Sequence, residues 1–61
     1  MAQNDYLDRA LADLGWSQND LARRIGVHRN SVSAWARGSA KLPGPVRAYL
    51  DLVLRIKGLM E

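Results

Sequence analysis

A single glycine, Gly26, begins a break of only three residues between two stretches of helical periodicity. The apolar stripes of these stretches are Leu21, Ala22 and Ile25 in the first, and Val32 and Trp35 in the second. Two helices joined by so short a connection must cross at a steep angle. This junction constrains the possible folds more than any other feature of the chain.

The whole chain reads as four helical segments, and nowhere do apolar and polar residues alternate over more than a few positions. We expect helices at about 5–14, 18–25, 29–37 and 45–57. Ser17 precedes the second as its N-cap, because SQND has the form of a capping box. Gly15, Gly26 and Gly38 end the first three helices, and the loop GSAKLPGP leads to the fourth. The sequence therefore predicts an all-α fold, with one domain over residues 1–61.

Composition excludes several classes of protein. The 61 residues include no cysteine, so neither disulfides nor thiolate metal ligands can hold the small core. One histidine, and no pair of carboxylates in a context that would hold them in a cleft, leave little from which to build an enzyme site. No apolar run approaches the roughly 20 residues of a membrane span, and the N-terminus does not resemble a signal peptide. We expect a cytoplasmic protein that is not an enzyme and binds no metal or cofactor.

Positive charge is concentrated in the middle of the chain. Residues 21–50 contain six basic residues and no acidic one, so this segment carries +6 while the flanks sum to −3. Such a run of charge is often only a solvated face with no binding role. It coincides, however, with the two central helices.

The segment GWSQNDLARRIGVHRNSVSAWARG, residues 15–38, resembles the Cro/C1-type (XRE) helix-turn-helix family of bacterial and phage regulators. The matching positions are Ser17, Gln18, Leu21, Ala22, Gly26, Val27, Val32, Trp35 and Gly38. The resemblance implies a compact lambda-repressor-like domain with the helix-turn-helix at 17–38. Family members commonly have five helices, and this chain has room for four. Most of the matching positions also have a structural reason, and we expect Val27, Val32 and Trp35 to fill the core between the helices.

The resemblance also implies that the helix at 29–37 lies in the major groove of double-stranded DNA. The candidates for base contact are His28, Arg29, Asn30, Ser33 and Ala34. Arg29 can hold guanine and Asn30 adenine through paired hydrogen bonds, whereas Ala34 can offer at most a contact to a thymine methyl group. The role of His28 stays open among capping the helix, contacting phosphate and reading a base.

Phosphate contacts are expected at the two ends of the motif, where they fix register and supply salt-dependent affinity. The candidates are Gln18, Arg23, Arg37, Ser39 and Lys41. Arg24 and Arg47 are expected only to add to the positive field.

The last helix has more apolar surface than one small core can cover, because its apolar side chains span about 240° of the helical circle. We assign Tyr49, Leu50 and Val53 to the core. We expect a homodimer whose interface consists of Leu52, Leu54, Ile56 and Leu59. The family resemblance also implies pairing, since two recognition helices spaced by one DNA turn read a palindrome.

These observations favour a sequence-specific DNA-binding transcriptional regulator, a small dimeric repressor that reads an inverted repeat and associates with the nucleoid. The alternative is an antitoxin or adaptor that acts on other proteins through the apolar helix at 45–57. A monomer with an apolar tail is a weaker alternative. Binding of the segment YLDLVLRIKGLM to a membrane surface is also weaker, because only Arg55 and Lys57 are basic in that segment.

Overall fold

The computed structural model describes residues 4–60, which form four α-helices and no strand. The helices are α1 (Asp5–Leu14), α2 (Gln18–Ile25), α3 (Arg29–Arg37) and α4 (Gly44–Met60). The all-α prediction is confirmed, and the first three helices have the expected bounds. Only α4 differs, because it extends to Met60 instead of ending near Lys57.

Local signals in the sequence account for the ends of these helices. The Asn4 side chain accepts a hydrogen bond from the Leu7 amide at 3.1 Å and so caps α1. The Asn4 amide donates to the Ala36 carbonyl at 3.1 Å, which ties the start of α1 to α3. After α2 the chain turns at Gly26, whose φ of +76° is a left-handed conformation that side chains with a β-carbon resist.

The core is entirely apolar among the described residues, and each helix contributes to it. Its buried members are Leu7, Ala10, Leu11, Leu21, Ala22, Val32, Trp35, Ala36 and Leu50. Of the inward positions expected in α2 and α3, Leu21, Ala22, Val32 and Trp35 are buried, and Ile25 is partly buried against this core. The most extensive packing joins α2 to α3.

Val27 does not lie in the core as the sequence suggested, since 37% of its surface is exposed. Its amide donates to the Ala22 carbonyl at 3.0 Å, so its backbone still belongs to the end of α2 while the chain reverses toward α3. Val27 therefore completes the turn without filling the space between the helices.

The rotation of α4 about its axis also differs from the expected one. Leu50 is buried, and Val46, Tyr49 and Leu54 are partly buried against the core. Since Val46, Leu50 and Leu54 follow one another at four-residue spacing, they form a single stripe that faces the other helices. Leu54 thus belongs to the core side and not to an exposed margin, whereas Val53 lines an outer groove with Ile56 and Met60.

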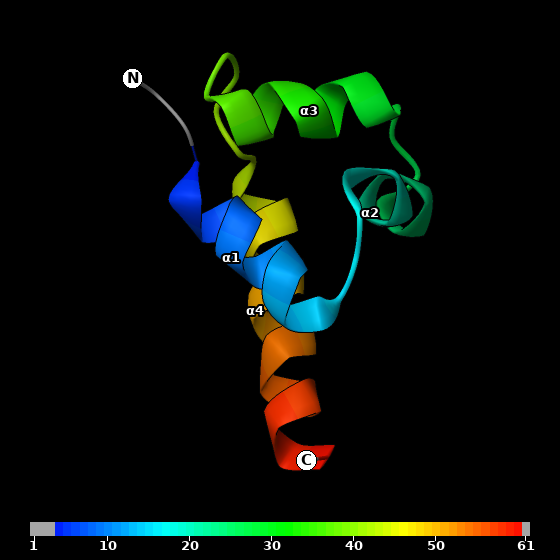
Figure 1. The fold of residues 1–61 in the computed structure, drawn as a ribbon, viewed down its shortest axis with the longest axis vertical. Coiled ribbons are helices and arrows are strands. Elements are labelled where there is room, and N and C mark those ends of the chain that lie inside the picture. The colour runs from blue at the N-terminus through cyan, green and yellow to red at the C-terminus, as the bar shows by residue number, and fades with distance from the viewer. Residues whose placement is uncertain (1–3, 61) are drawn as a thin grey trace.

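The elements are arranged along a long axis, with principal extents of 33 × 24 × 19 Å. Figure 1 shows α3 lying across one end of this axis, while the C-terminal half of α4 projects from the opposite end. Helix α3 and the excess apolar surface of α4 therefore lie at opposite ends of the molecule.

Tyr6 joins α1 to α4 on the surface. Its hydroxyl donates to the Asp51 carboxylate and approaches the Arg47 carbonyl at 3.3 Å, while the Arg47 guanidinium lies 4.6 Å from the centre of the Tyr6 ring. Burial is the largest cause that raises the pKa of Tyr6 to about 12, followed by the hydrogen bond to Asp51 and the charge of that carboxylate. The opposite charge of Arg47 acts in the other direction.

The first prediction concerns this contact at high pH. An unfolded tyrosine loses its proton near pH 10, whereas folded Tyr6 holds it to about pH 12, so the contribution of Tyr6 to stability is complete below pH 10 and is lost between these values. Urea unfolding should show the unsubstituted protein losing more stability from pH 9.5 to 12 than Tyr6→Phe, in which lysine titration is unchanged. Equal losses in the two proteins would show that Tyr6 does not titrate differently on folding.

Candidate nucleic-acid interface

An open polar cleft lies where the N-terminus of α2 meets the exposed face of α3. It has a volume of about 450 Å³. Its lining residues are Ser17, Gln18, Asn19, Arg29, Asn30 and Ser33. The structure thus brings together four residues selected from the sequence, Gln18, Arg29, Asn30 and Ser33, from both helices of the motif.

Two lining residues, Ser17 and Asn19, were not among the candidates. Ser17 was recognised only as a cap, and Asn19 occupies a position with no distinctive sequence signal. No hydrogen bond within residues 4–60 uses the backbone amides of Gln18 and Asn19, which belong to the first turn of α2. Such amides at a helix N-terminus attract anions, because the helix dipole adds to their own polarity.

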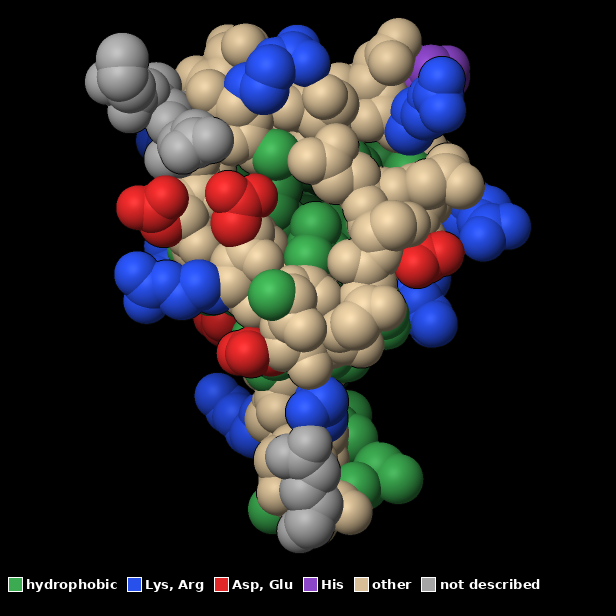
Figure 2. All heavy atoms as spheres, viewed as in Figure 1, with side chains coloured by type: hydrophobic (Ala, Val, Ile, Leu, Met, Phe, Trp, Pro, Cys, Tyr) green, Lys and Arg blue, Asp and Glu red, His purple; other side chains and the backbone are tan. Residues whose placement is uncertain are grey.

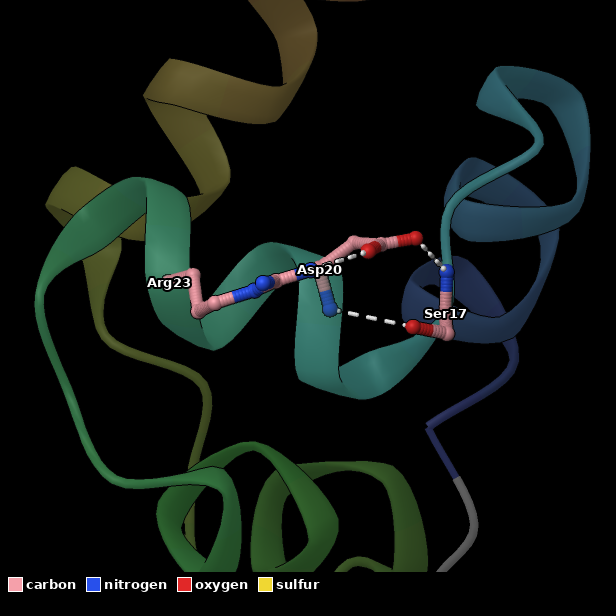
Figure 3. A network of polar contacts seen from close by, with 3 residues as sticks. All are labelled: Ser17, Asp20 and Arg23. Carbon is pink, nitrogen blue, oxygen red and sulfur yellow. Dashed lines mark hydrogen bonds and ion pairs between the residues drawn. The ribbon is translucent and has the colours of Figure 1, made fainter.

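A capping box holds this end of α2 in place, as Figure 3 shows. The Asp20 amide donates to the Ser17 hydroxyl at 3.0 Å, and the Ser17 amide donates to the Asp20 carboxylate at 2.9 Å. The hydrogen bond from the Ser17 amide is the main cause that lowers the pKa of the Asp20 carboxyl. The predicted capping box is confirmed, and it fixes the direction in which the free amides of α2 point.

Arg23 is one helical turn from Asp20, and its guanidinium lies 3.3 Å from the carboxylate. This surface ion pair is worth little in free energy, and the side chain of Arg23 stays largely exposed. Arg23 therefore remains accessible to a phosphate, but part of its charge is already balanced.

His28 occupies the N-cap position of α3, and its Nδ1 accepts a hydrogen bond from the Asn30 amide at 3.0 Å. Of the three roles left open by the sequence, the structure therefore shows capping. Imidazole is not among the short polar side chains that most often cap helices, and the His28 ring remains exposed.

The other end of α3 carries the remaining candidates. Arg37 donates to the Ser33 hydroxyl at 2.8 Å, so its guanidinium lies back along the exposed face of α3. Ser39 and Lys41 are exposed in the segment that follows the helix, whereas Ala34 is half-buried. Arg37, Ser39 and Lys41 do not line the cleft, and they form a second polar region at the C-terminal end of α3.

Charge at this end of the molecule is positive. Figure 2 shows Lys and Arg side chains where α3 lies, and the Asp and Glu side chains visible on that face lie elsewhere. Arg24 and Arg47 are not part of the cleft, because their guanidinium groups lie over the rings of Trp16 and Tyr6 at 4.1 and 4.6 Å. A surface of positive potential attracts polyanions.

The described residues contain no cluster of three or more histidine, cysteine or acidic side chains suited to a metal ion. Over the same residues, no helix has the length and apolar character that crossing a bilayer requires.

A helix-turn-helix family model matches residues 7–49. The matched span includes α2, α3 and the whole cleft, and it ends within the first part of α4. No curated protein and no solved structure gives a significant match to the chain.

The second prediction tests the capping box by its pH dependence. Because the pKa of Asp20 is lowered by folding, its contribution to stability is present above the unfolded pKa of about 3.9 and is lost as pH falls through the folded value. Asp20→Asn should therefore destabilise the protein at pH 6, and the difference should become smaller as the pH is lowered toward 2. Asp13→Asn, which alters an exposed carboxylate of α1, provides the control for chemical denaturation at each pH. A difference that persists unchanged at pH 2 would contradict the assignment.

Proposed function

This chain belongs to the Cro/C1-type helix-turn-helix family of DNA-binding regulators, and we propose that it is a small dimeric repressor that reads an inverted repeat through the major groove. The observation that carries the proposal is the polar cleft that joins the N-terminus of α2 to the exposed face of α3. Its neutral and basic lining suits a nucleic acid, which presents phosphates beside the edges of its bases.

Base recognition is assigned to the N-terminal half of α3. Arg29 and Asn30 are exposed in the first turn of this helix, where recognition helices contact base edges. A guanidinium can donate to guanine O6 and N7, and a carboxamide can bond adenine N6 and N7. Ser33 lies one turn further along the same face, while His28 and Ala34 contribute at its margins.

Phosphate contacts are assigned to both sides of that face. At the α2 side, the Gln18 side chain and the amides of Gln18 and Asn19 offer hydrogen bonds to one phosphate, with Arg23 beside them. At the far end of α3, Ser39 and Lys41 are exposed together with Arg37. Contacts on both sides hold the helix in register along the groove.

Pairing is assigned to the exposed apolar side chains of α4. Leu52, Ile56 and Leu59 are 53%, 46% and 82% exposed. Leu54, which we also assigned to the interface from the sequence, is left out because it packs against the core. A pair would bind two half-sites at once, and the second contact is then made at a high effective concentration.

A second candidate function has support from one groove. Leu14, Trp16, Val53, Ile56 and Met60 line an apolar groove where α4 leaves the body of the domain, and Lys57 lies beside them. An antitoxin or adaptor would use such a surface to hold another protein. The DNA-binding proposal accounts for the cleft and the charge as well, so we prefer it.

The third prediction separates base reading from phosphate binding. The preferred site is first selected from a random duplex pool, and binding is then measured by fluorescence anisotropy at several salt concentrations. Arg29→Ala should reduce the free energy of binding to this site by about 1–3 kcal/mol and relax the preference at one base position. Lys41→Ala should weaken binding to all duplexes alike. It should also reduce the slope of log affinity against log salt concentration by about 1.

Arg9→Ala is the matched control, because it removes an arginine from α1 and should change neither property. Equal losses on selected and random DNA would make Arg29 a phosphate contact. An unchanged salt slope would remove Lys41 from the interface.

The fourth prediction concerns assembly. Leu52→Glu combined with Ile56→Glu should give a monomer in analytical ultracentrifugation, because the new charges cannot be buried against a second chain. The helical content should be kept, since both positions are exposed, while affinity for the full site should fall to that of one half-site.

Ala12→Glu, at an exposed position of α1, serves as the control and should leave the pair intact. For the unsubstituted protein, the melting temperature should rise with protein concentration. A monomer at high micromolar concentration that binds one asymmetric site would contradict pairing.

A further inference from the structure

The exposed face of α4 has the spacing of a coiled-coil seam. Tyr49, Leu52, Ile56 and Leu59 follow one another at intervals of three, four and three residues, which are the a and d positions of a heptad. The last three are exposed, whereas Tyr49 is half-buried at the start of the stripe. Most of this seam lies beyond residue 49, outside the part of the chain that the family model matches.

The seam and the core stripe occupy different sides of the same helix. Leu50 and Leu54 face the domain, and at 100° per residue they lie well over 100° from the line through Leu52 and Leu59. Because α4 also projects from the body of the domain (Figure 1), nothing within residues 4–60 covers the far end of the seam. A second copy of this helix presents a surface of the same chemistry and spacing.

The position of α3 restricts how two copies can be oriented. Since α3 and the C-terminal half of α4 lie at opposite ends of the 33 Å axis (Figure 1), antiparallel pairing would place the two recognition helices at opposite ends of the dimer. Parallel pairing places both at one end, side by side. A protomer is 24 Å across its second axis, so their separation is on the scale of the about 34 Å between successive major-groove sites.

Charge next to the seam favours the same orientation. In a parallel pair the flanking Arg55 lies beside Met60 of the other copy, and its aliphatic stem can pack there. In a fully overlapped antiparallel pair, Arg55 would lie beside its own counterpart, and two like charges would meet at the centre of the interface. Such a juxtaposition is unfavourable.

We infer that α4 forms a short parallel coiled coil with the α4 of a second copy, with the two-fold axis along the long axis of the molecule. This inference rests on the proposed function, in which two copies bind one duplex, and it adds the orientation of the pair. The recognition helices then face the same side of the DNA.

Disulfide trapping tests the orientation, and the absence of native cysteine makes single substitutions unambiguous. The variants are Leu52→Cys, Ile56→Cys and Leu59→Cys, with Ala12→Cys on α1 as the collision control. In a parallel pair each seam residue faces its own counterpart at a separation that a disulfide can span. In an antiparallel pair an a position faces a d position instead.

Each seam variant, oxidised alone, should form dimers about 10-fold faster than Ala12→Cys. In equimolar mixtures with one partner labelled with nitrogen-15, Ile56→Cys should pair mainly with itself in mass spectrometry, and only rarely with Leu52→Cys or Leu59→Cys. The oxidised Leu59→Cys dimer should also bind an inverted repeat at least about 10-fold more tightly than the reduced protein at nanomolar concentration, because linkage replaces a bimolecular step.

Two other outcomes would overturn the inference and can be told apart. Mixed disulfides between Ile56→Cys and either leucine variant, in excess over same-residue pairs, would show an antiparallel dimer and leave the proposed function standing. Cross-linking no faster than that of Ala12→Cys, together with a monomer by sedimentation, would reject the parallel seam and also the dimer in the proposed function. Binding of the monomer to duplex DNA would then still support the base-reading part.

Discussion

The packing of α2 against α3 is the contact on which the remaining structure depends. Leu21 and Val32 are fully buried there, and Gly26 supplies the left-handed turn that lets two short helices cross so closely. Without that crossing, the first turn of α2 and the exposed face of α3 would not enclose one cleft. The site is therefore a consequence of how the core is built, although almost none of its side chains take part in the core.

Helix bounds could be predicted from the sequence because their determinants are local. Capping side chains and terminal glycines act within a few residues, so Ser17 and Gly38 mark their helix ends whatever packs nearby. The expected burial of Val27 was wrong, and the packing of Leu54 against the core was not foreseen, for the opposite reason. Both depend on how an element is rotated relative to its neighbours, and an apolar arc as wide as that of α4 is compatible with more than one rotation.

The candidate site could likewise be predicted from the sequence only in part. The pattern of residue types indicated which face of α3 is polar, and Gln18, Arg29 and Asn30 indeed share a cleft. Sequence alone could not show that Asn19 completes it, or that Arg23 is partly balanced by Asp20. Those facts depend on side-chain conformations, which neither composition nor spacing specifies.

The hydrogen bond at the start of α3 has a consequence for the chemistry of His28. Because Nδ1 accepts the amide hydrogen of Asn30, the neutral ring must carry its own hydrogen on Nε2. One tautomer is thereby selected before any ligand arrives. The opposite edge of the imidazole is then a hydrogen-bond donor, suited to a phosphate oxygen or to the N7 of a purine and unsuited to an exocyclic amino group. His28, which caps the start of α3, therefore also presents one fixed hydrogen-bond donor at the exposed edge of its ring.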